Sequence, residues 1–171
     1  MANQVTSLRM EQKFKKTPAG HIPFDWQSVE LRSIASMEYG SALPGRKRIA
    51  GDVPVYGSNG IVGYHMQAAA EGPGIVIGRK GTAGAIAWAE KKFWPIDTTY
   101  YISRDNSKVE LRWLYYLLHH LKLVDLNAST GVPGLNREHV YALSIPLPPA
   151  REQKKISEIL SAVDAAIEKT N

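Results

Sequence analysis

The C-terminal part of the sequence carries the pattern that most restricts the fold. An extended apolar run ends at three closely spaced prolines, Pro146, Pro148 and Pro149. Proline fixes φ and has no amide hydrogen, so it ends a strand yet is tolerated at the start of a helix. Beyond the prolines, apolar residues recur at steps of four, three and four, the spacing of a coiled-coil seam: Ile156, Leu160, Val163 and Ile167. The pattern predicts extended chain over 143–147 and a helix over 151–171.

This C-terminal helix cannot bury its own apolar stripe, so it must either pack on the rest of the chain or pair with another helix. At about 1.5 Å per residue the helix extends roughly 30 Å. Residues 151–171 hold four basic and four acidic side chains, so the helix is neutral overall. We therefore predict that the chain forms a homodimer through the seam residues Ile156, Leu160, Val163 and Ile167.

The remainder of the chain indicates a mixed fold. Short apolar runs at 53–56, 61–64, 75–77, 85–88 and 98–102 are separated by turn-forming residues, as in β-hairpins. Leucines at intervals of three and four predict an amphipathic helix over 110–121, and the proline-containing segment 14–26 is expected to be an extended strap. We predict an α+β fold, in which a curved, mostly antiparallel β-sheet with packed helices over 1–149 is followed by a long coiled-coil helix over 150–171.

Composition narrows the functional class. The 171 residues include no cysteine, which excludes a disulfide framework and a cysteine-based zinc site. No apolar run is long enough to span a bilayer, and the polar N-terminus lacks a signal-peptide segment, so a cytoplasmic protein without membrane association is expected. Because the C-terminal helix is neutral, the net charge of +5 lies in residues 1–150, which favours an anionic partner for that region.

Several segments in a fixed order resemble the specificity subunits of type I restriction-modification systems. The resemblance is carried by the strap, with Lys15-Lys16-Thr17-Pro18 and Asp25-Trp26, and by the junction Ile145-Pro146-Leu147-Pro148-Pro149 followed by Glu152-Gln153. Three internal segments also look like recurrent segments of that family: 56–64, 78–84 and 129–136. The likeness covers residues 14–171.

The resemblance implies a target-recognition domain over 1–149 and a conserved spacer helix over 150–171. The usual subunit of the family has two such sets, so the chain resembles a half-subunit that reads one half of a bipartite duplex DNA site. The implied partners are methyltransferase and restriction subunits, which would carry S-adenosylmethionine, ATP and Mg²⁺. No cofactor or metal is expected on this chain, and the chain itself is expected to be non-catalytic.

The loop that begins at Gly78 is the first candidate DNA contact. Arg79 and Lys80 lie between glycines after an expected buried strand, and Thr82 adds a hydroxyl donor. Cations between glycines can approach a phosphate backbone closely. A solvated hairpin tip is the alternative for this loop, and the family resemblance favours DNA contact.

Two further clusters are candidates with open alternatives. Ser58 and Asn59 precede a glycine, so they form a turn and can also present hydrogen-bonding groups to base edges. Arg46, Lys47 and Arg48 form the densest short basic cluster, which suits phosphate contacts or simple solvent exposure.

The polar loop 129–136 contributes the remaining candidates, Ser129, Thr130 and Asn136. Its resemblance to a recurrent family loop places it on or near the DNA face. An alternative role is structural, with Leu135 packed under the sheet and Asn136 capping a short helix over 137–142. Both roles can hold for different residues of the loop.

The sequence argues against an enzyme. His119 and His120 are adjacent on a helix, so their side chains diverge by about 100° and cannot form an i, i+4 metal pair.

The remaining alternatives are the recognition region of a single-chain restriction-methyltransferase, and a helical protein-protein adaptor without DNA binding. Monomeric behaviour favours the first alternative, and salt-independent behaviour toward duplex DNA favours the second.

Overall fold

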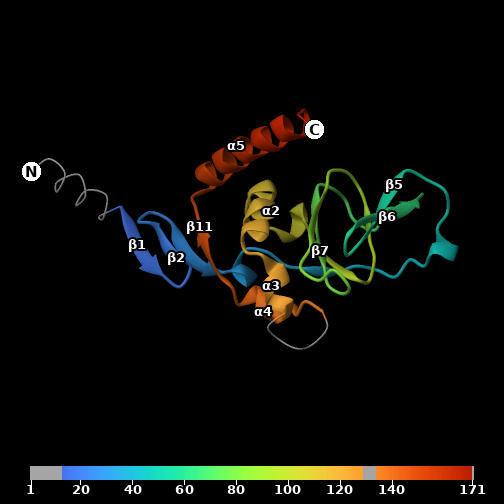
Figure 1. The fold of residues 1–171 in the computed structure, drawn as a ribbon, viewed down its shortest axis with the longest axis horizontal. Helices are drawn as coiled ribbons and strands as arrows, with labels where there is room; N and C mark the ends of the chain where they lie inside the picture. Colours follow the sequence, from blue (N-terminus) through green and yellow to red (C-terminus); the bar gives the residue numbers. More distant parts are fainter. Residues whose placement is uncertain (1–12, 129–133, 171) are drawn as a thin grey trace, which may run out of the picture. The chain divides into compact units, whose positions relative to one another are not determined.

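The computed structural model describes residues 13–128 and 134–170, and the chain divides into two units (Figure 1). One unit joins the N-terminal residues, through Ser33, to the C-terminal residues from Tyr141. The other unit is continuous and comprises Ile34–Val140. Each unit therefore has its own secondary structure and is described separately.

The first unit is built on two small antiparallel sheets. The predicted strap forms a hairpin of β1 (Phe14–Thr17) and β2 (Gly20–Pro23). Strand β3 (Gln27–Glu30) leads into the 3₁₀ turn η1 (Leu31–Ser33) and pairs with β11 (Ser144–Leu147) from the far end of the sequence. The expectation of extended chain before the prolines is confirmed, and Ile145 is fully buried there.

Helix α5 (Ala150–Glu168) begins directly after the prolines, as predicted. The side chain of Gln153 is buried and donates a hydrogen bond to the Pro148 carbonyl at 2.8 Å, which fixes the first turn. The Trp26 indole N–H donates to a Glu152 carboxylate oxygen at 2.9 Å, so the strap is tied to the same turn. These two bonds explain why an aromatic ends the strap and why Glu152-Gln153 follows the proline stop.

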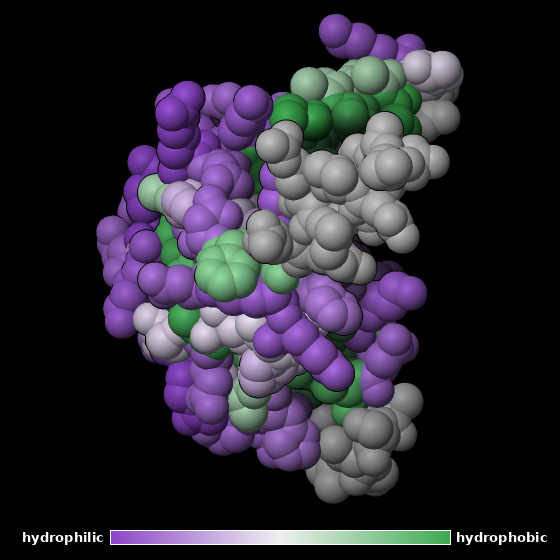
Figure 2. All heavy atoms as spheres, turned by 90° about the vertical axis from the view of Figure 1, so that its left-hand side faces the viewer, coloured by the Kyte–Doolittle hydropathy of each residue, from purple (hydrophilic) through white to green (hydrophobic). Residues whose placement is uncertain are grey.

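Most of the apolar stripe of α5 is exposed in this chain, whereas the first seam residue, Ile156, is partly buried. Figure 2 shows hydrophobic residues gathered along the helix at the top of the view. The exposed fractions of Leu160, Val163 and Ile167 are 37%, 49% and 54%, and neighbouring Ile159 is 55% exposed. The predicted seam thus remains available to a second helix.

The second unit contains two sheets and the remaining helices. A four-stranded sheet has the order β4–β10–β7–β8, and a three-stranded sheet has the order β6–β5–β9. The strands are β4 (Glu38–Tyr39), β5 (Val53–Gly57), β6 (Gly60–His65), β7 (Gly74–Gly78), β8 (Ile86–Ala89), β9 (Trp94–Pro95) and β10 (Thr99–Ser103). The helical elements are η2 (Gly45–Lys47), η3 (Arg104–Asn106), α2 (Leu111–His120), α3 (Leu123–Ala128) and α4 (Arg137–Tyr141).

Strand β7 forms the centre of this unit, and all five of its residues are buried. Helix α2 packs on β7 and β8, with Leu114 and Leu118 fully buried. Phe93 is also fully buried and meets Tyr56 edge-on at 5.9 Å between ring centroids. Burial of apolar side chains stabilises the folded state by roughly 25 cal/mol per Å² of apolar surface. The core therefore keeps in place the strand ends that carry the candidate site.

The mixed α/β class with antiparallel pairing is confirmed, but the prediction of one curved sheet is wrong. In the part of the chain that the structure describes, the strands are divided among four small sheets, and β5 pairs with β9 in parallel. Apolar runs and turn residues indicate where the chain is extended. They do not determine which strands pair, because pairing depends on contacts distant in sequence. Helix α3 and strands β4 and β9 also escaped the sequence analysis.

Candidate nucleic-acid interface

A single backbone carbonyl joins two of the predicted loops. The Thr98 carbonyl accepts hydrogen bonds from the Arg79 and Lys80 amides at 2.9 and 3.2 Å. The same oxygen accepts the Ser58 hydroxyl at 2.8 Å. The structure therefore brings the turn after β5 beside the loop after β7. The Ser58 hydroxyl is engaged within the protein.

Gly78 is required where these two loops meet. A Cβ atom at this position would lie 2.2 Å from the Thr82 carbonyl oxygen and 2.9 Å from the Ser58 carbonyl oxygen. Both neighbours are backbone atoms, so the loops would have to separate to admit a side chain. Gly81 has φ of +73°, a conformation that favours glycine, and it carries the chain around the loop tip.

The end of the 129–136 loop docks on the same place. The Leu135 amide donates to the Arg79 carbonyl at 2.8 Å, and the Leu135 side chain is 3% exposed. The buried Tyr100 hydroxyl donates to the Leu135 carbonyl at 3.1 Å. The Asn136 side chain accepts the Glu138 amide at 2.8 Å and so caps α4. The helix-capping role of Asn136 is thus confirmed, and the Leu135 side chain is buried.

These contacts surround a cavity of about 330 Å³ within the second unit. Arg79 and Lys80 line one part of it, and Asn136 lines another. The remaining lining residues are Tyr39, Tyr100, Gly134, Leu135, Arg137 and Glu138. Three of the predicted DNA-binding residues therefore share one concave surface, together with an additional arginine.

The guanidinium group of Arg79 is held in place by the protein. Its Nη2 donates to the Asp97 carbonyl at 2.6 Å, and its Cζ lies 5.3 Å from the Tyr39 ring centroid. Arg137 lies over the same ring at 4.8 Å, and its Nη1 donates to the Met37 carbonyl at 3.0 Å. A planar guanidinium fixed in this way is suited to recognition of an anion.

Ser58 and Asn59 line a separate, smaller cavity of about 110 Å³, with Val76 and Ala85 to Ala87. Asn59 is exposed and Thr82 is exposed on the neighbouring loop. Their assignment to base reading stays a prediction. Ser129 and Thr130 lie outside the described residues.

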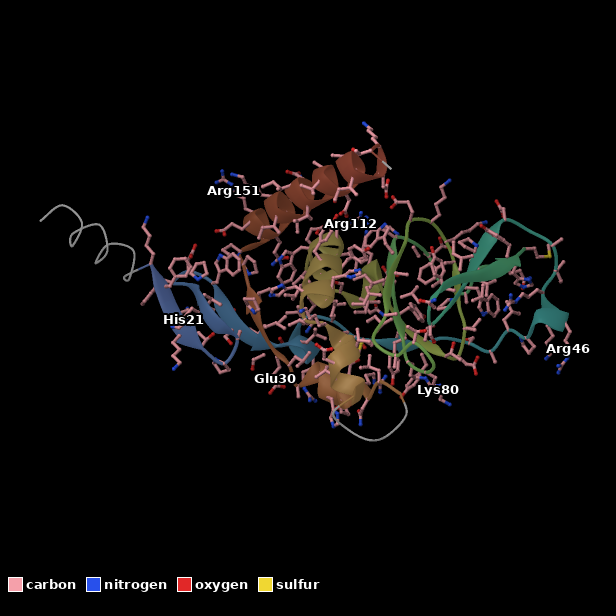
Figure 3. All side chains as sticks on the ribbon, in the orientation of Figure 1. His21, Glu30, Arg46, Lys80, Arg112 and Arg151 are labelled. Carbon is pink, nitrogen blue, oxygen red and sulfur yellow. The ribbon has the colours of Figure 1, made fainter. Side chains whose placement is uncertain are left out.

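The basic cluster Arg46–Arg48 lies apart from the larger cavity. Figure 3 shows Arg46 at the outer end of the η2 loop, well separated from Lys80. Arg46 and Lys47 are exposed. Arg48 donates from Nη1 to the Val62 carbonyl at 2.7 Å, so this side chain also holds the loop against β6. A phosphate contact from this cluster stays a prediction, and it would be distinct from any contact at the cavity.

Tyr39 and Arg137 were missed by the sequence analysis. Tyr39 follows no recognisable motif, and Arg137 was treated only as the first residue of a short helix. The position of Arg137, directly after the recurrent loop 129–136, could have identified it as a candidate site residue. Its role became visible only when the Met37 carbonyl, 100 positions earlier, was placed beside it.

Alkaline pH is expected to destabilise this unit. Burial, followed by the neighbouring Tyr39, raises the pKa of Tyr100 above its ordinary value of 10.0, although Arg79 and Arg137 act in the opposite direction. Burial also raises the pKa of Tyr56 and Tyr101. Phenols with raised pKa values stay protonated in the folded state, so stability is retained below pH 10 and falls as pH rises through the raised values. Urea unfolding between pH 8 and 11 should show this fall, and Tyr100→Phe should make it shallower. Equal slopes in the two proteins would contradict the assignment.

Among residues 13–128 and 134–170, no group of three or more His, Cys, Asp or Glu side chains is placed to hold a metal ion. Within the same ranges, no helix is long and apolar enough to cross a membrane.

Comparison with known proteins identifies the family. Residues 23–171 match the family model described as the type I restriction modification DNA specificity domain. The chain belongs to this family. A relative from Haemophilus influenzae, named as a type I restriction enzyme specificity subunit, is 30% identical over 122 residues, which cover 69% of the chain and 31% of the relative. The resemblance predicted from sequence is confirmed.

Other specificity-domain proteins extend the match over most of the chain. The MjaX specificity subunit of Methanocaldococcus jannaschii is 28% identical over 92% of the chain and 44% of the relative. The chain thus spans less than half the length of these curated relatives. Their names as specificity subunits agree with the prediction of a non-catalytic chain.

Solved structures share the fold. The S subunit of a type I restriction-modification system from M. genitalium matches with a TM-score of 0.76 and 19% identity, over 85% of the chain and 41% of that subunit. The HsdS subunit from Thermoanaerobacter tengcongensis matches with a TM-score of 0.65 and 19% identity, over 98% of the chain and 45% of that subunit. At this identity, the likeness concerns the fold alone.

Proposed function

We propose that this specificity-domain chain recognises duplex DNA at one half of a bipartite site, with residues 1–149 as the reading domain and 150–171 as the spacer and dimerisation helix. The observation that carries the proposal is the convergence of Arg79, Lys80 and Arg137 on one cavity in a chain of this family. Cations at a concave surface bind phosphates, while neighbouring polar loops such as that of Asn59 can reach base edges.

Binding measured against salt concentration tests this proposal. For two phosphates neutralised at the cavity, log affinity should fall against log salt with a slope of about −1.8, which is roughly a 12-fold loss between 50 and 200 mM salt. Fluorescence anisotropy with labelled duplexes gives both quantities. Failure to bind any duplex at 50 mM salt, or an affinity that does not change with salt concentration, would favour the adaptor alternative.

We further propose that two copies pair through the exposed stripe of α5 as a coiled coil. The stripe exposes four large apolar residues, and the four basic and four acidic side chains of residues 151–171 balance. The usual subunit of this family has two recognition domains and two spacer helices, so two copies of this chain would together present such a pair. A second copy is therefore the occupant that best suits this surface.

Catalysis would then come from partner subunits in the cytoplasm. One of the matching structures is titled as describing complex assembly and conformational transition of the type I restriction-modification system. We propose that this chain assembles with methyltransferase and restriction subunits, which would supply S-adenosylmethionine, ATP and Mg²⁺. Copurification with a methyltransferase subunit, followed by sequencing of methylated sites, gives the partner and the target together. A symmetric bipartite target is expected, and methylation at a site without two halves would contradict pairing.

A further inference from the structure

Two arginines share one tyrosine ring beside the larger cavity. The Cζ atoms of Arg79 and Arg137 lie 5.3 and 4.8 Å from the Tyr39 ring centroid. Tyr39 in turn meets the buried Tyr100 ring edge-on at 5.1 Å. Both arginines also line the cavity, so an anion bound there would be attracted to both positive charges.

Both guanidinium groups donate to backbone carbonyls. Arg79 donates one N–H to Asp97 and Arg137 donates one to Met37. These bonds fix the plane of each group, and the carbonyl bond leaves the charge of Arg79 in place. In addition, the Arg79 Nε is buried and finds no acceptor among the described residues. A ligand oxygen would provide one, since a buried N–H group without a partner is unfavourable.

The chemistry of the cavity favours a phosphate over a base. Its lining carries the cations Arg79, Lys80 and Arg137 against the carboxylate of Glu138. Guanidinium groups already lie over the Tyr39 ring, so a base would have to compete with them for this ring. Arginine forks match the oxygens of phosphate in a bidentate manner, and several cations can share a single phosphate.

We propose that this cavity binds one phosphate group through Arg79 and Arg137, and that Tyr39 is the positioning residue that holds both guanidinium groups. The assignment of this phosphate to a DNA backbone rests on the proposed function. The same chemistry would accept free inorganic phosphate, so the two sources must be separated by experiment. Tyr39 is uncharged, so its replacement leaves the net charge of the protein the same. A Tyr39 variant therefore tests the positioning of the guanidinium groups separately from their charge.

The test compares wild-type protein with Tyr39→Leu, Tyr39→Phe and Arg137→Gln. The first measurement is the thermal unfolding midpoint in sodium phosphate and in sodium chloride at equal ionic strength. Phosphate should raise the midpoint of the wild type and of Tyr39→Phe, which keeps the ring. The increase should be lost in Tyr39→Leu and Arg137→Gln, because ligand binding stabilises only a competent folded state.

The second measurement is duplex affinity against salt for the same proteins. Arg137→Gln should lower the magnitude of the log–log slope by about 0.9, the value for one phosphate contact. Tyr39→Leu should weaken duplex binding about tenfold and Tyr39→Phe less than twofold. Glu138→Gln, which removes the carboxylate from the cavity lining, should strengthen binding.

The combined outcomes separate the possibilities. If phosphate no longer raises the unfolding midpoint of the variants and their salt slope also changes, a DNA phosphate binds in the cavity. If phosphate no longer raises the midpoint but the salt slope is unchanged, the cavity binds free phosphate. If the wild type binds no duplex but its phosphate effect depends on Tyr39, the proposed function fails and the cavity assignment stands. An identical phosphate effect and identical slopes in all variants would overturn the cavity assignment. Arg137→Gln leaves the Tyr39–Tyr100 contact in place, so the test does not depend on folding of Tyr39→Leu.

Discussion

Replacing Arg79 and Lys80 together by alanine is expected to weaken binding to all duplexes by a similar factor, on the order of 30-fold. The two side chains line the cavity beside β7, and phosphate contacts contribute to affinity without reading sequence. The magnitude of the log–log salt slope should fall by about two, because two phosphate contacts are lost. Anisotropy titrations with duplexes of unrelated sequence between 50 and 200 mM salt measure both effects.

The matched control is the double variant Lys91→Ala, Lys92→Ala. These adjacent lysines are exposed in the same unit, so the control removes the same net charge away from the cavity. It should change affinity only by a small factor. Arg79→Ala also removes the bond to the Asp97 carbonyl, so the thermal unfolding midpoint must be measured alongside. Equal loss of affinity in both double variants would show that the loop has no specific role.

Leu160→Asp is expected to convert a dimer to a monomer. Leu160 lies in the centre of the exposed stripe on α5. Burial of a leucine contributes about 1.5–3 kcal/mol, and pairing would lose this on both helices, so the dissociation constant should rise by more than about 100-fold. A buried unpaired carboxylate adds to the cost. Size-exclusion chromatography with light scattering at micromolar concentration should report half the wild-type mass.

Ala165→Asp provides the control for this change. Ala165 is exposed on the same helix, and five residues of rotation place it about 140° from Leu160. The control adds the same charge and a similar loss of helix propensity outside the stripe. It should leave the mass of the dimer unchanged. A wild-type protein that is already monomeric, or a Leu160→Asp variant with unchanged mass, would rule out the seam and favour the single-chain alternative.

Local features of the fold were readable from the sequence. The prolines before Ala150 predicted the end of β11 and the start of α5, because proline acts on its own backbone and its immediate neighbours. The leucine spacing predicted α2, since three- and four-residue intervals place side chains on one helix face. Asn136 was correctly predicted as a helix cap. Each of these inferences needed only residues a few positions apart.

The candidate site was only partly predictable for the same reason. Arg79, Lys80 and Asn136 were selected from their loops, and the structure places all three around one cavity. Arg46 and Lys47 looked equally suitable as a local cluster, yet Arg46 lies far from Lys80 (Figure 3). Charge density along the chain therefore ranked basic clusters without indicating which of them share a surface.

The sequence by itself determined the family, the positions of the main strands and helices, and the exposed apolar stripe of α5. These properties follow from residue order and from short-range backbone geometry. The tertiary structure alone decided that Tyr39 holds Arg79 and Arg137 beside one cavity. Those three residues come from distant parts of the chain, and their contacts form only when β4, the loop after β7 and α4 are brought together by burial of the core between them.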